Sequence, residues 1–197
     1  MRESRRAAGS HYLYEATVGA GLPVIQTLRD LRETGDEIRR VEGMFSGTLA
    51  YLFNTWDGSQ SFSSVVRQAK SLGYTEPDPR DDLSGMDVAR KLIILGREMG
   101  QRLEMGDVVV ESLVPSALQK CGIDEFLDRL SEFDEPMLAR LRAAAARGQV
   151  LRYVGSVDVD GKAKVGVVEL PASHPFANIA LTDNIVRFET ARYDKNP

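Results

Sequence analysis

The sequence predicts an α+β fold in which helices cover one face of a mixed β-sheet. Apolar residues recur at helical spacing through most of the first 147 residues, whereas the last fifty alternate in strand fashion around Asp160-Gly161, a dipeptide typical of two-residue hairpins. A chain of 197 residues, 43% of them hydrophobic, can bury one sizeable core. We therefore expect one domain over residues 11–197, preceded by a loose leader at residues 1–10.

For residues 12–45, the elements are predicted from apolar alternation, from helical periodicity and from the positions of glycine. Residues 12–18 alternate and predict a strand that leads into the turn 19–21, where we expect positive φ at both glycines. Apolar residues at helical spacing predict a helix over residues 23–34, which Gly35 ends. Residues 36–45 then predict a strand.

For residues 46–79, three further segments are predicted from helix-capping residues and from glycine and proline, which interrupt helices. Ser46 is placed to cap a helix whose apolar residues extend to Trp56. A second helix is expected over residues 63–72, with Gly73 as its stop. The run 75–79 contains two prolines and predicts a loop without helix.

The remaining chain divides into helices and strands. A long helix is predicted from Ser84 or Gly85 to about Leu103. Residues 112–147 are rich in helix formers, and we expect them to be helical with a break near Glu135-Pro136. Strands are predicted at 150–157, 164–170 and 184–190.

The amino-acid composition limits the classes of partner that the chain is expected to bind and the compartment in which it is expected to lie. Lys and Arg number 25 against 29 Asp and Glu, and the net charge of −4 argues against a nucleic-acid or anionic-membrane binder. Cys121 is the single cysteine, so an internal disulfide is excluded and the cytoplasm is favoured; we interpret Cys121 as a packing residue at a helix end. No apolar run approaches the roughly 20 residues that cross a bilayer. Small molecules and proteins are the expected partners.

The densest chemistry lies in residues 76–91, which hold five carboxylates and three cations. Asp87 and Lys91 are four residues apart and fall on one helical face among apolar neighbours. Three interpretations stay open: an exposed salt bridge worth about 0.3–0.5 kcal/mol, a pocket in which carboxylates bind a substrate ammonium while the lysine assists a reacting oxygen, or a divalent metal site. The ligands of that metal would be Asp78, Asp81 and Asp82.

Two other features resemble functional motifs only in part. The turn 19–21 lacks the third glycine of a dinucleotide fingerprint, because position 24 is valine. His11 and His174 are the only histidines, and neither has a partner at metal-ligand spacing. We assign neither to catalysis and interpret His174 as a solvated turn residue.

Three motifs carry a family resemblance. Residues 14–23 (YEATVGAGLP), 46–49 (SGTL) and 73–91 (GYTEPDPRDDLSGMDVARK) resemble homoserine dehydrogenase in order and spacing. The closing residues 175–178 and 183–186 extend the likeness over about residues 11–193. The resemblance implies NAD- or NADP-dependent interconversion of L-aspartate 4-semialdehyde and L-homoserine, a step toward threonine, methionine and isoleucine.

The resemblance also assigns residues. Lys91 is implied as the proton donor or electrostatic catalyst at the aldehyde oxygen, and Gly73 as a glycine that approaches the nicotinamide cofactor. Glu76, Asp87 and Thr48 are implied to bind the substrate. The family holds a monovalent cation such as sodium largely through backbone carbonyls, at positions that match Glu15, Val18, Ala20 and Leu22.

Departures from the family limit what this chain does alone. Family members flank this region with a nucleotide-binding fold that we expect to be absent from these 197 residues, and Ala50 replaces a frequent asparagine. We therefore interpret the chain as the substrate-binding domain of a homoserine dehydrogenase, or of a fused aspartokinase enzyme, that forms a homodimer through a face or edge of its sheet. The alternative is a non-catalytic dimerisation fragment. The isolated chain is expected to fold and dimerise with little or no hydride transfer.

Overall fold

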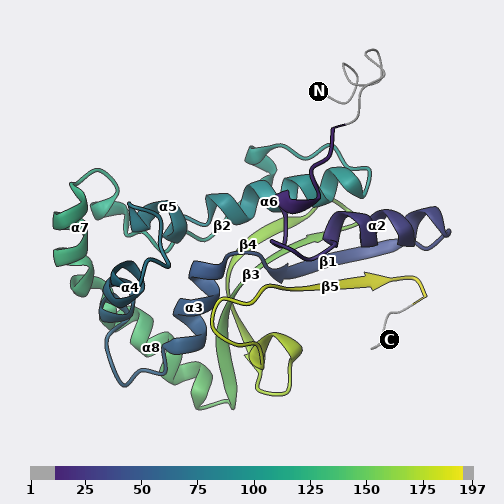
Figure 1. Ribbon diagram of the computed structural model, residues 1–197. Helices are drawn as coiled ribbons and strands as arrows, with labels where there is room; N and C mark the ends of the chain where they lie inside the picture. Colours follow the sequence, from purple (N-terminus) through teal and green to yellow (C-terminus); the bar gives the residue numbers. More distant parts are fainter. Residues whose placement is uncertain (1–11, 193–197) are drawn as a thin grey trace.

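A five-stranded sheet in the order β2-β4-β3-β1-β5 frames residues 12–192, the part of the chain that this computed structural model describes (Figure 1). Adjacent strands are antiparallel except β2 and β4, which run parallel, so the predicted mixed sheet of an α+β fold is confirmed. The strands are β1 (Ile38–Met44), β2 (Val108–Val110), β3 (Gln149–Asp158), β4 (Ala163–Pro171) and β5 (Ile185–Thr190).

Helices pack against this sheet mainly through β1 and β3. α6 contacts β2, β3 and β4, α3 and α8 contact β3, and α2 contacts β1 (Figure 1). None of the described helices is long and apolar enough to cross a membrane. The α-helices are α2 (Val24–Glu33), α3 (Gly47–Thr55), α4 (Phe62–Ser71), α5 (Pro79–Leu83), α6 (Met86–Glu98), α7 (Ile123–Arg129) and α8 (Asp134–Ala145). The 3-10 helices are η1 (Glu15–Thr17), η2 (Met105–Asp107), η3 (Ser116–Leu118), η4 (Leu130–Phe133) and η5 (Pro175–Ala177).

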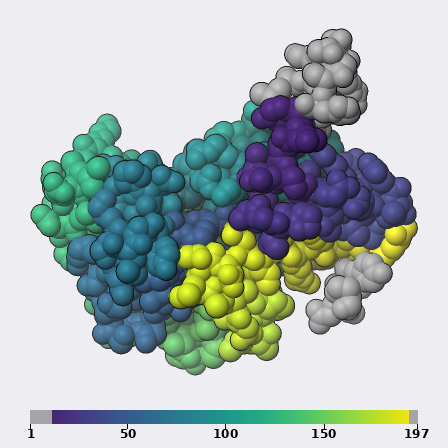
Figure 2. Space-filling view, in the orientation of Figure 1, coloured from purple at the N-terminus to yellow at the C-terminus, as the bar shows by residue number. Residues whose placement is uncertain are grey.

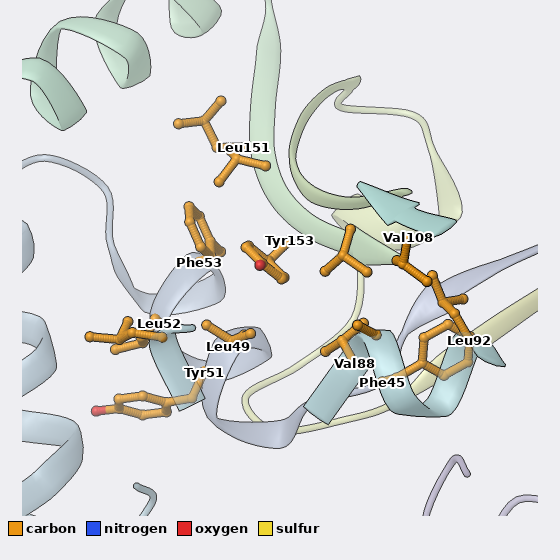
Figure 3. Packing of buried hydrophobic residues seen from close by; sticks show 14 of the residues in the cluster. Phe45, Leu49, Tyr51, Leu52, Phe53, Val88, Leu92, Val108, Leu151 and Tyr153 are labelled. Atoms are coloured by element: carbon orange, nitrogen blue, oxygen red, sulfur yellow. The ribbon is translucent and has the colours of Figure 1, made fainter. Parts of the chain in front are cut away.

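Most of the core lies between α3, α6 and the helix-covered face of β3. Figure 3 shows Tyr153 of β3 between Phe53 of α3 and Val88 of α6, and Leu92 of α6 beside Phe45. Each of these side chains is at most 3% exposed. Burying an apolar side chain of this size contributes roughly 1.5–3 kcal/mol, so this layer fixes the position of α6 firmly.

The opposite face of the sheet carries a smaller apolar cluster and a shallow hollow. Alternation along β3 directs Val154 and Ser156 away from the helices, and Val154 packs against Phe176 of η5. Arg152, 8% exposed, ties this region to the sheet by donating to the carbonyls of Phe53, Phe176 and Ala177. Burial lowers the pKa of Arg152. This face is thus covered mainly by the η5 region, with a contribution from Ala50 of α3.

Several predicted elements are confirmed with small shifts at their ends. The helix at 23–34 is α2, the strand at 36–45 is β1, and the helix at 63–72 is α4. Ser46 caps α3 by accepting a hydrogen bond from the backbone N–H of Leu49, as expected. The hairpin around Asp160-Gly161 and the last strand are present as β3, β4 and β5.

The predicted strand at residues 12–18 is wrong. Residues 15–17 form η1, because Thr17 bonds back to the Tyr14 carbonyl and the Glu15 carboxylate accepts from the backbone of Ile25. At the following turn Gly19 has φ +79, as predicted, but the second positive φ belongs to Ala20 rather than to Gly21. The leader at residues 1–10 and His11 lie outside the described residues.

Proline and glycine explain the other corrections. Pro79 begins the short helix α5 at its first position, where no backbone N–H is needed. α6 ends at Glu98 instead of Leu103, because Gly100 (φ +96) closes it.

The predicted helix over 112–122 is wrong: these residues form turns and the short η3, with Pro115 directly before η3 and Gly122 directly before α7. From Ile123 onward the chain is helical as predicted, but its break lies at η4, and Pro136 falls within the first turn of α8. The three-residue strand β2 was too short for its pattern to indicate.

Candidate functional site

Lys91 is held at a fixed point between α6 and the end of β1. Its Nζ lies 2.5 Å from Asp87 Oδ2, one helical turn earlier, and donates to the carbonyl of Phe45 at 2.8 Å. The Lys91 side chain is 22% exposed and that of Asp87 is 48% exposed. A main-chain partner from another element distinguishes this lysine from a mobile surface ion pair.

The start of α6 is set by close packing on β3. Gly85 precedes the helix with φ +71, and a side chain there would collide with the Tyr153 hydroxyl. That hydroxyl donates to the Glu111 carbonyl at 2.7 Å, and burial raises the pKa of Tyr153. A Cβ at Gly155 would lie 2.9 Å from Val88 Cγ1 of α6. Two glycines therefore let the helix approach the strand closely and place Asp87 and Lys91.

A half-buried carboxylate, Asp82, links two of the predicted substrate residues. Its Oδ1 lies 2.8 Å from Thr48 Oγ1, and its Oδ2 accepts from the backbone N–H of Glu76 at 2.8 Å. Thr48 Oγ1 also lies 2.6 Å from the Tyr74 carbonyl. Burial raises the pKa of Asp82. Thr48, 9% exposed, thus supports the loop that carries Glu76.

Glu76, Asp82 and Asp87 line an acidic cleft of about 580 Å³, and Lys91 lies beside it through its ion pair with Asp87. The Glu76 side chain is exposed there, and Asp87 reaches the cleft from α6. The cleft has the size of a small-molecule site, and its carboxylates suit a cationic group. Its lining residues are Glu76, Asp81, Asp82, Ser84, Met86, Asp87 and Arg90.

Gly73 lies at the end of α4, one residue before the Tyr74 carbonyl that Thr48 contacts. Its φ of +75 favours glycine, and a Cβ there would meet no atom within 4 Å. The backbone of Gly73 is therefore open to an incoming molecule.

The four residues of the implied cation site lie apart from the cleft, before α2. The Glu15 carboxylate accepts from the backbone N–H groups of Ile25 and Gln26 at 2.8 and 2.9 Å, so it caps that helix. Leu22 accepts from the Val24 backbone, whereas no backbone N–H within residues 12–192 reaches the carbonyls of Val18 or Ala20. In the space-filling view, this purple segment lies against α2 (Figure 2), and the hydroxyl of Tyr14 at its start donates to Glu98 of α6.

The hypothesis of a divalent metal at Asp78, Asp81 and Asp82 is wrong. Over residues 12–192, no group of three or more His, Cys, Asp or Glu side chains could hold a metal ion. Asp78 instead pairs with Arg80 at 2.7 Å, and that guanidinium lowers the pKa of Asp78.

The other side chains considered from the sequence have local roles. His174 is partly buried rather than solvated: it accepts from the Phe176 backbone, and burial lowers its pKa. Cys121 is partly buried in the turn before α7, where its thiol donates to the Leu118 carbonyl.

Sequence reasoning missed the supporting residues. Asp82 is one of five carboxylates in residues 76–91, and no local signal in the sequence shows that it is the one that supports Glu76 and contacts Thr48. Tyr153 and Gly155 lie about sixty residues after α6, so only the folded sheet brings them to it.

Comparisons with known proteins agree with this geometry. A family model described as homoserine dehydrogenase matches residues 23–196. The chain is 57% identical to the chloroplastic bifunctional aspartokinase/homoserine dehydrogenase 1 of Zea mays, with all of this chain aligned to 22% of the relative. It is 51% identical to the homoserine dehydrogenase of Paracoccidioides brasiliensis, with 93% of this chain aligned to 52% of that protein.

A solved structure gives the same result for the fold. A protein of unknown function from Candida auris superimposes with a TM-score of 0.87 at 47% identity, over 91% of this chain and 52% of that one. The chain thus spans about half the length of its fungal relatives and less of the bifunctional plant relative. Since the family model covers nearly the whole sequence, the chain belongs to the homoserine dehydrogenase family.

Proposed function

We propose that this chain forms the substrate-binding and catalytic domain of an enzyme that interconverts L-homoserine and L-aspartate 4-semialdehyde. The observation that carries the proposal is the restrained Lys91 ammonium beside an acidic cleft that contains Glu76 and Asp87. The aspartate-derived substrate has both an ammonium group and a reacting oxygen, and the cleft offers groups for each. The reaction belongs to amino-acid biosynthesis, toward threonine, methionine and isoleucine.

The carboxylates bind the substrate ammonium. Glu76 is exposed at the cleft and its backbone is fixed by Asp82, so its carboxylate projects from a stable loop. Asp87 adds a second negative charge one turn before Lys91. Charge-assisted hydrogen bonds of this kind are about twice as strong as neutral ones. Thr48 acts by holding Asp82.

Lys91 stabilises charge at the substrate oxygen. Its ammonium has three donors, of which Asp87 and the Phe45 carbonyl engage two. The third can point to a carbonyl or hydroxyl oxygen in the cleft. A donor held in place before the reaction stabilises the developing alkoxide and can transfer a proton to it.

A nicotinamide cofactor, NAD or NADP, supplies or accepts the hydride when bound. The residues present fit it in one respect: the open backbone of Gly73, directly before the Tyr74 carbonyl that Thr48 contacts, allows close approach. Across the described residues the turn at 19–21 follows η1 instead of a strand, so it is not the glycine-rich unit that cradles a dinucleotide. Gly73 therefore contributes a contact rather than the whole binding site.

A monovalent cation such as sodium fits the segment before α2. Val18 is fully buried, yet within the described chain its carbonyl and that of Ala20 receive no backbone N–H. A buried carbonyl oxygen without a donor costs stability, and a cation bound there would satisfy it. With Glu15 and Leu22, these positions would hold the ion and stiffen the turn that leads into α2.

The open sheet face supports a homodimer. A hollow of about 90 Å³ there is bordered by side chains of β1, β3, β4 and η5, among them Val154, Ser156 and Val168. Apolar and charged groups alternate on it, as in interfaces with a polar rim. The single cysteine supports a reducing compartment such as the cytoplasm.

Domain replacement tests the proposed reaction. In a chimera, this chain replaces the matching half of the Paracoccidioides brasiliensis relative. Oxidation of L-homoserine by NAD or NADP is then measured on the chimera. We expect turnover, and a loss of kcat on the order of 10²-fold in Lys91→Ala but not in Lys162→Ala, whose side chain is 81% exposed. A folded chimera that binds cofactor without turnover, or one indifferent to Lys91→Ala, would contradict the proposal.

A further inference from the structure

Arg80 connects the loop of the acidic cleft to a distant turn of the chain. It lies on α5, and its Nη1 donates to the carbonyls of Cys121 at 2.7 Å and Leu118 at 3.2 Å. Its Nε and Nη2 donate to both carboxylate oxygens of Asp78. The guanidinium also lies 5.4 Å from the centroid of the buried Phe126 ring. None of these partners lines the cleft.

The chemistry of these contacts requires arginine. A guanidinium presents five N–H donors in one plane, which here divide between a carboxylate on one edge and main-chain carbonyls on the other. A lysine ammonium is a point charge and cannot span both sets while stacking on a ring. The Arg80 side chain is only 17% exposed, so solvent does not replace these partners freely.

The same loop is anchored on its other side by the site itself. Asp82, two residues after Arg80, holds the Glu76 backbone and contacts Thr48 of α3. Asp78 caps α5 through the Arg80 backbone N–H. Residues 76–82 are therefore fixed between α3 on one side and the turn at 118–121 on the other, and neither of these two segments lines the cleft.

We infer that Arg80 is a positioning residue for substrate binding, which acts by fastening residues 76–82 to the 118–121 turn so that Glu76 and Asp82 keep their places. This rests on the proposed function for its substrate. A displacement of about 1 Å at such groups is enough to weaken a site strongly. The turn before α7 thereby becomes part of the support of a cleft that it does not touch.

The test compares Arg80→Gln with Arg67→Gln. Arg67, on α4, also donates to a carbonyl of the α7 region, that of Leu127 at 2.8 Å, but its other side-chain hydrogen bond goes to Ser63 rather than to residues 76–82. Both variants lose a tie to α7 and we expect similar falls in Tm. Amide hydrogen exchange over residues 74–84 and calorimetric titration of L-homoserine are then measured on the chain and both variants.

In Arg80→Gln we expect faster exchange of the Glu76 amide and a Kd for L-homoserine about tenfold higher, with neither change in Arg67→Gln. Arg80→Lys keeps the charge beside Asp78, and we expect it to change the Glu76 exchange rate and the Kd in the same direction to a smaller extent. This variant replaces Arg80→Gln in the test if Arg80→Gln does not fold. Unchanged exchange, or faster exchange with unchanged affinity, would overturn the inference. If the unaltered chain binds no L-homoserine, the proposed function fails, and exchange alone decides whether Arg80 holds the loop.

Discussion

Asp82 shows how one side chain supports the cleft without projecting into it as a free charge. With Asp82 ionised, the Thr48 hydroxyl faces two acceptors, Asp82 Oδ1 and the Tyr74 carbonyl, and can donate to only one. A protonated Asp82 can donate to Thr48, which then donates to Tyr74. Burial favours that neutral form and raises the pKa of Asp82.

This raised pKa makes stability depend on pH in a specific direction. The folded chain binds the Asp82 proton more tightly than the unfolded chain, so the stabilisation is complete below the ordinary aspartate pKa of about 4 and is lost as pH rises through the higher folded value. We expect the free energy of unfolding of the unaltered chain to fall relative to Asp82→Asn across that window. Urea titrations at successive pH values measure the difference, with exposed Asp81→Asn as control. Parallel profiles for the chain and Asp82→Asn would show that Asp82 titrates normally.

The sequence indicates some of these residues and conceals others. Asp87 and Lys91 are four apart on one helix, so their pairing follows from spacing alone. The contact of Thr48 with Asp82 joins positions 34 residues apart. No periodicity reports that separation, because it depends on how α3 and α5 pack.

At the scale of elements, α6 is the part whose placement decides the site. It carries Asp87 and Lys91 on one face and buries Val88 and Leu92 on the other. Its approach to β3 depends on Gly155, where the strand has no side chain between it and the helix. A closely packed interior transmits any change there to the site.

Gly155→Ala should therefore separate α6 from β3. The new methyl would lie 2.9 Å from Val88 Cγ1 and 3.2 Å from Leu92 Cδ1. We expect a loss of about 1–3 kcal/mol in the free energy of unfolding and weaker binding of L-homoserine, because Asp87 moves with the helix. Urea unfolding and calorimetry measure the two effects. Gly106→Ala, in η2 with open space around it, should change neither. Equal behaviour of the two variants would mean that the packing at Gly155 is unimportant.

How well each element could be predicted depends on whether its sequence carries clear signals for its ends. Helices with an apolar stripe and a cap or glycine stop, such as α2, α3 and α4, were predicted nearly to their ends. Residues 12–18 alternate like a strand, but their hydrogen bonds go to their own turn and to the start of α2. Competition between local bonds and strand pairing is not visible in alternation.

At the scale of the whole molecule, the two faces of the sheet differ in what covers them. Helices cover one face with the core, whereas the other has the hollow beside Val154 and Ser156. The alternation of β3 does not indicate which face of the sheet stays open, because Gly155 on the helix-covered face and Ser156 on the open face are both small. The open face is where we expect the second copy of the chain.

Ser156→Arg tests that interface. A long cation projecting from the open face, near Arg40 and Lys164, should prevent the two sheets from meeting. Sedimentation velocity should show a dimer for the unaltered chain and a monomer for Ser156→Arg. Val109→Arg, at a 66% exposed position on the edge strand β2, should remain dimeric. A dimer that survives Ser156→Arg and dissociates in Val109→Arg would place the interface at the edge of the sheet.

The most direct measurement is calorimetric titration of L-homoserine into this chain, into Asp87→Asn and into Asp160→Asn. Asp160 carries the same charge on the distant hairpin, 73% exposed, and asparagine suits that turn equally well. We expect binding at one site per chain, weakened at least about tenfold in Asp87→Asn and unchanged in Asp160→Asn. Absence of binding, or equal affinity in all three proteins, would contradict the claim that the acidic cleft beside Lys91 is the amino-acid site.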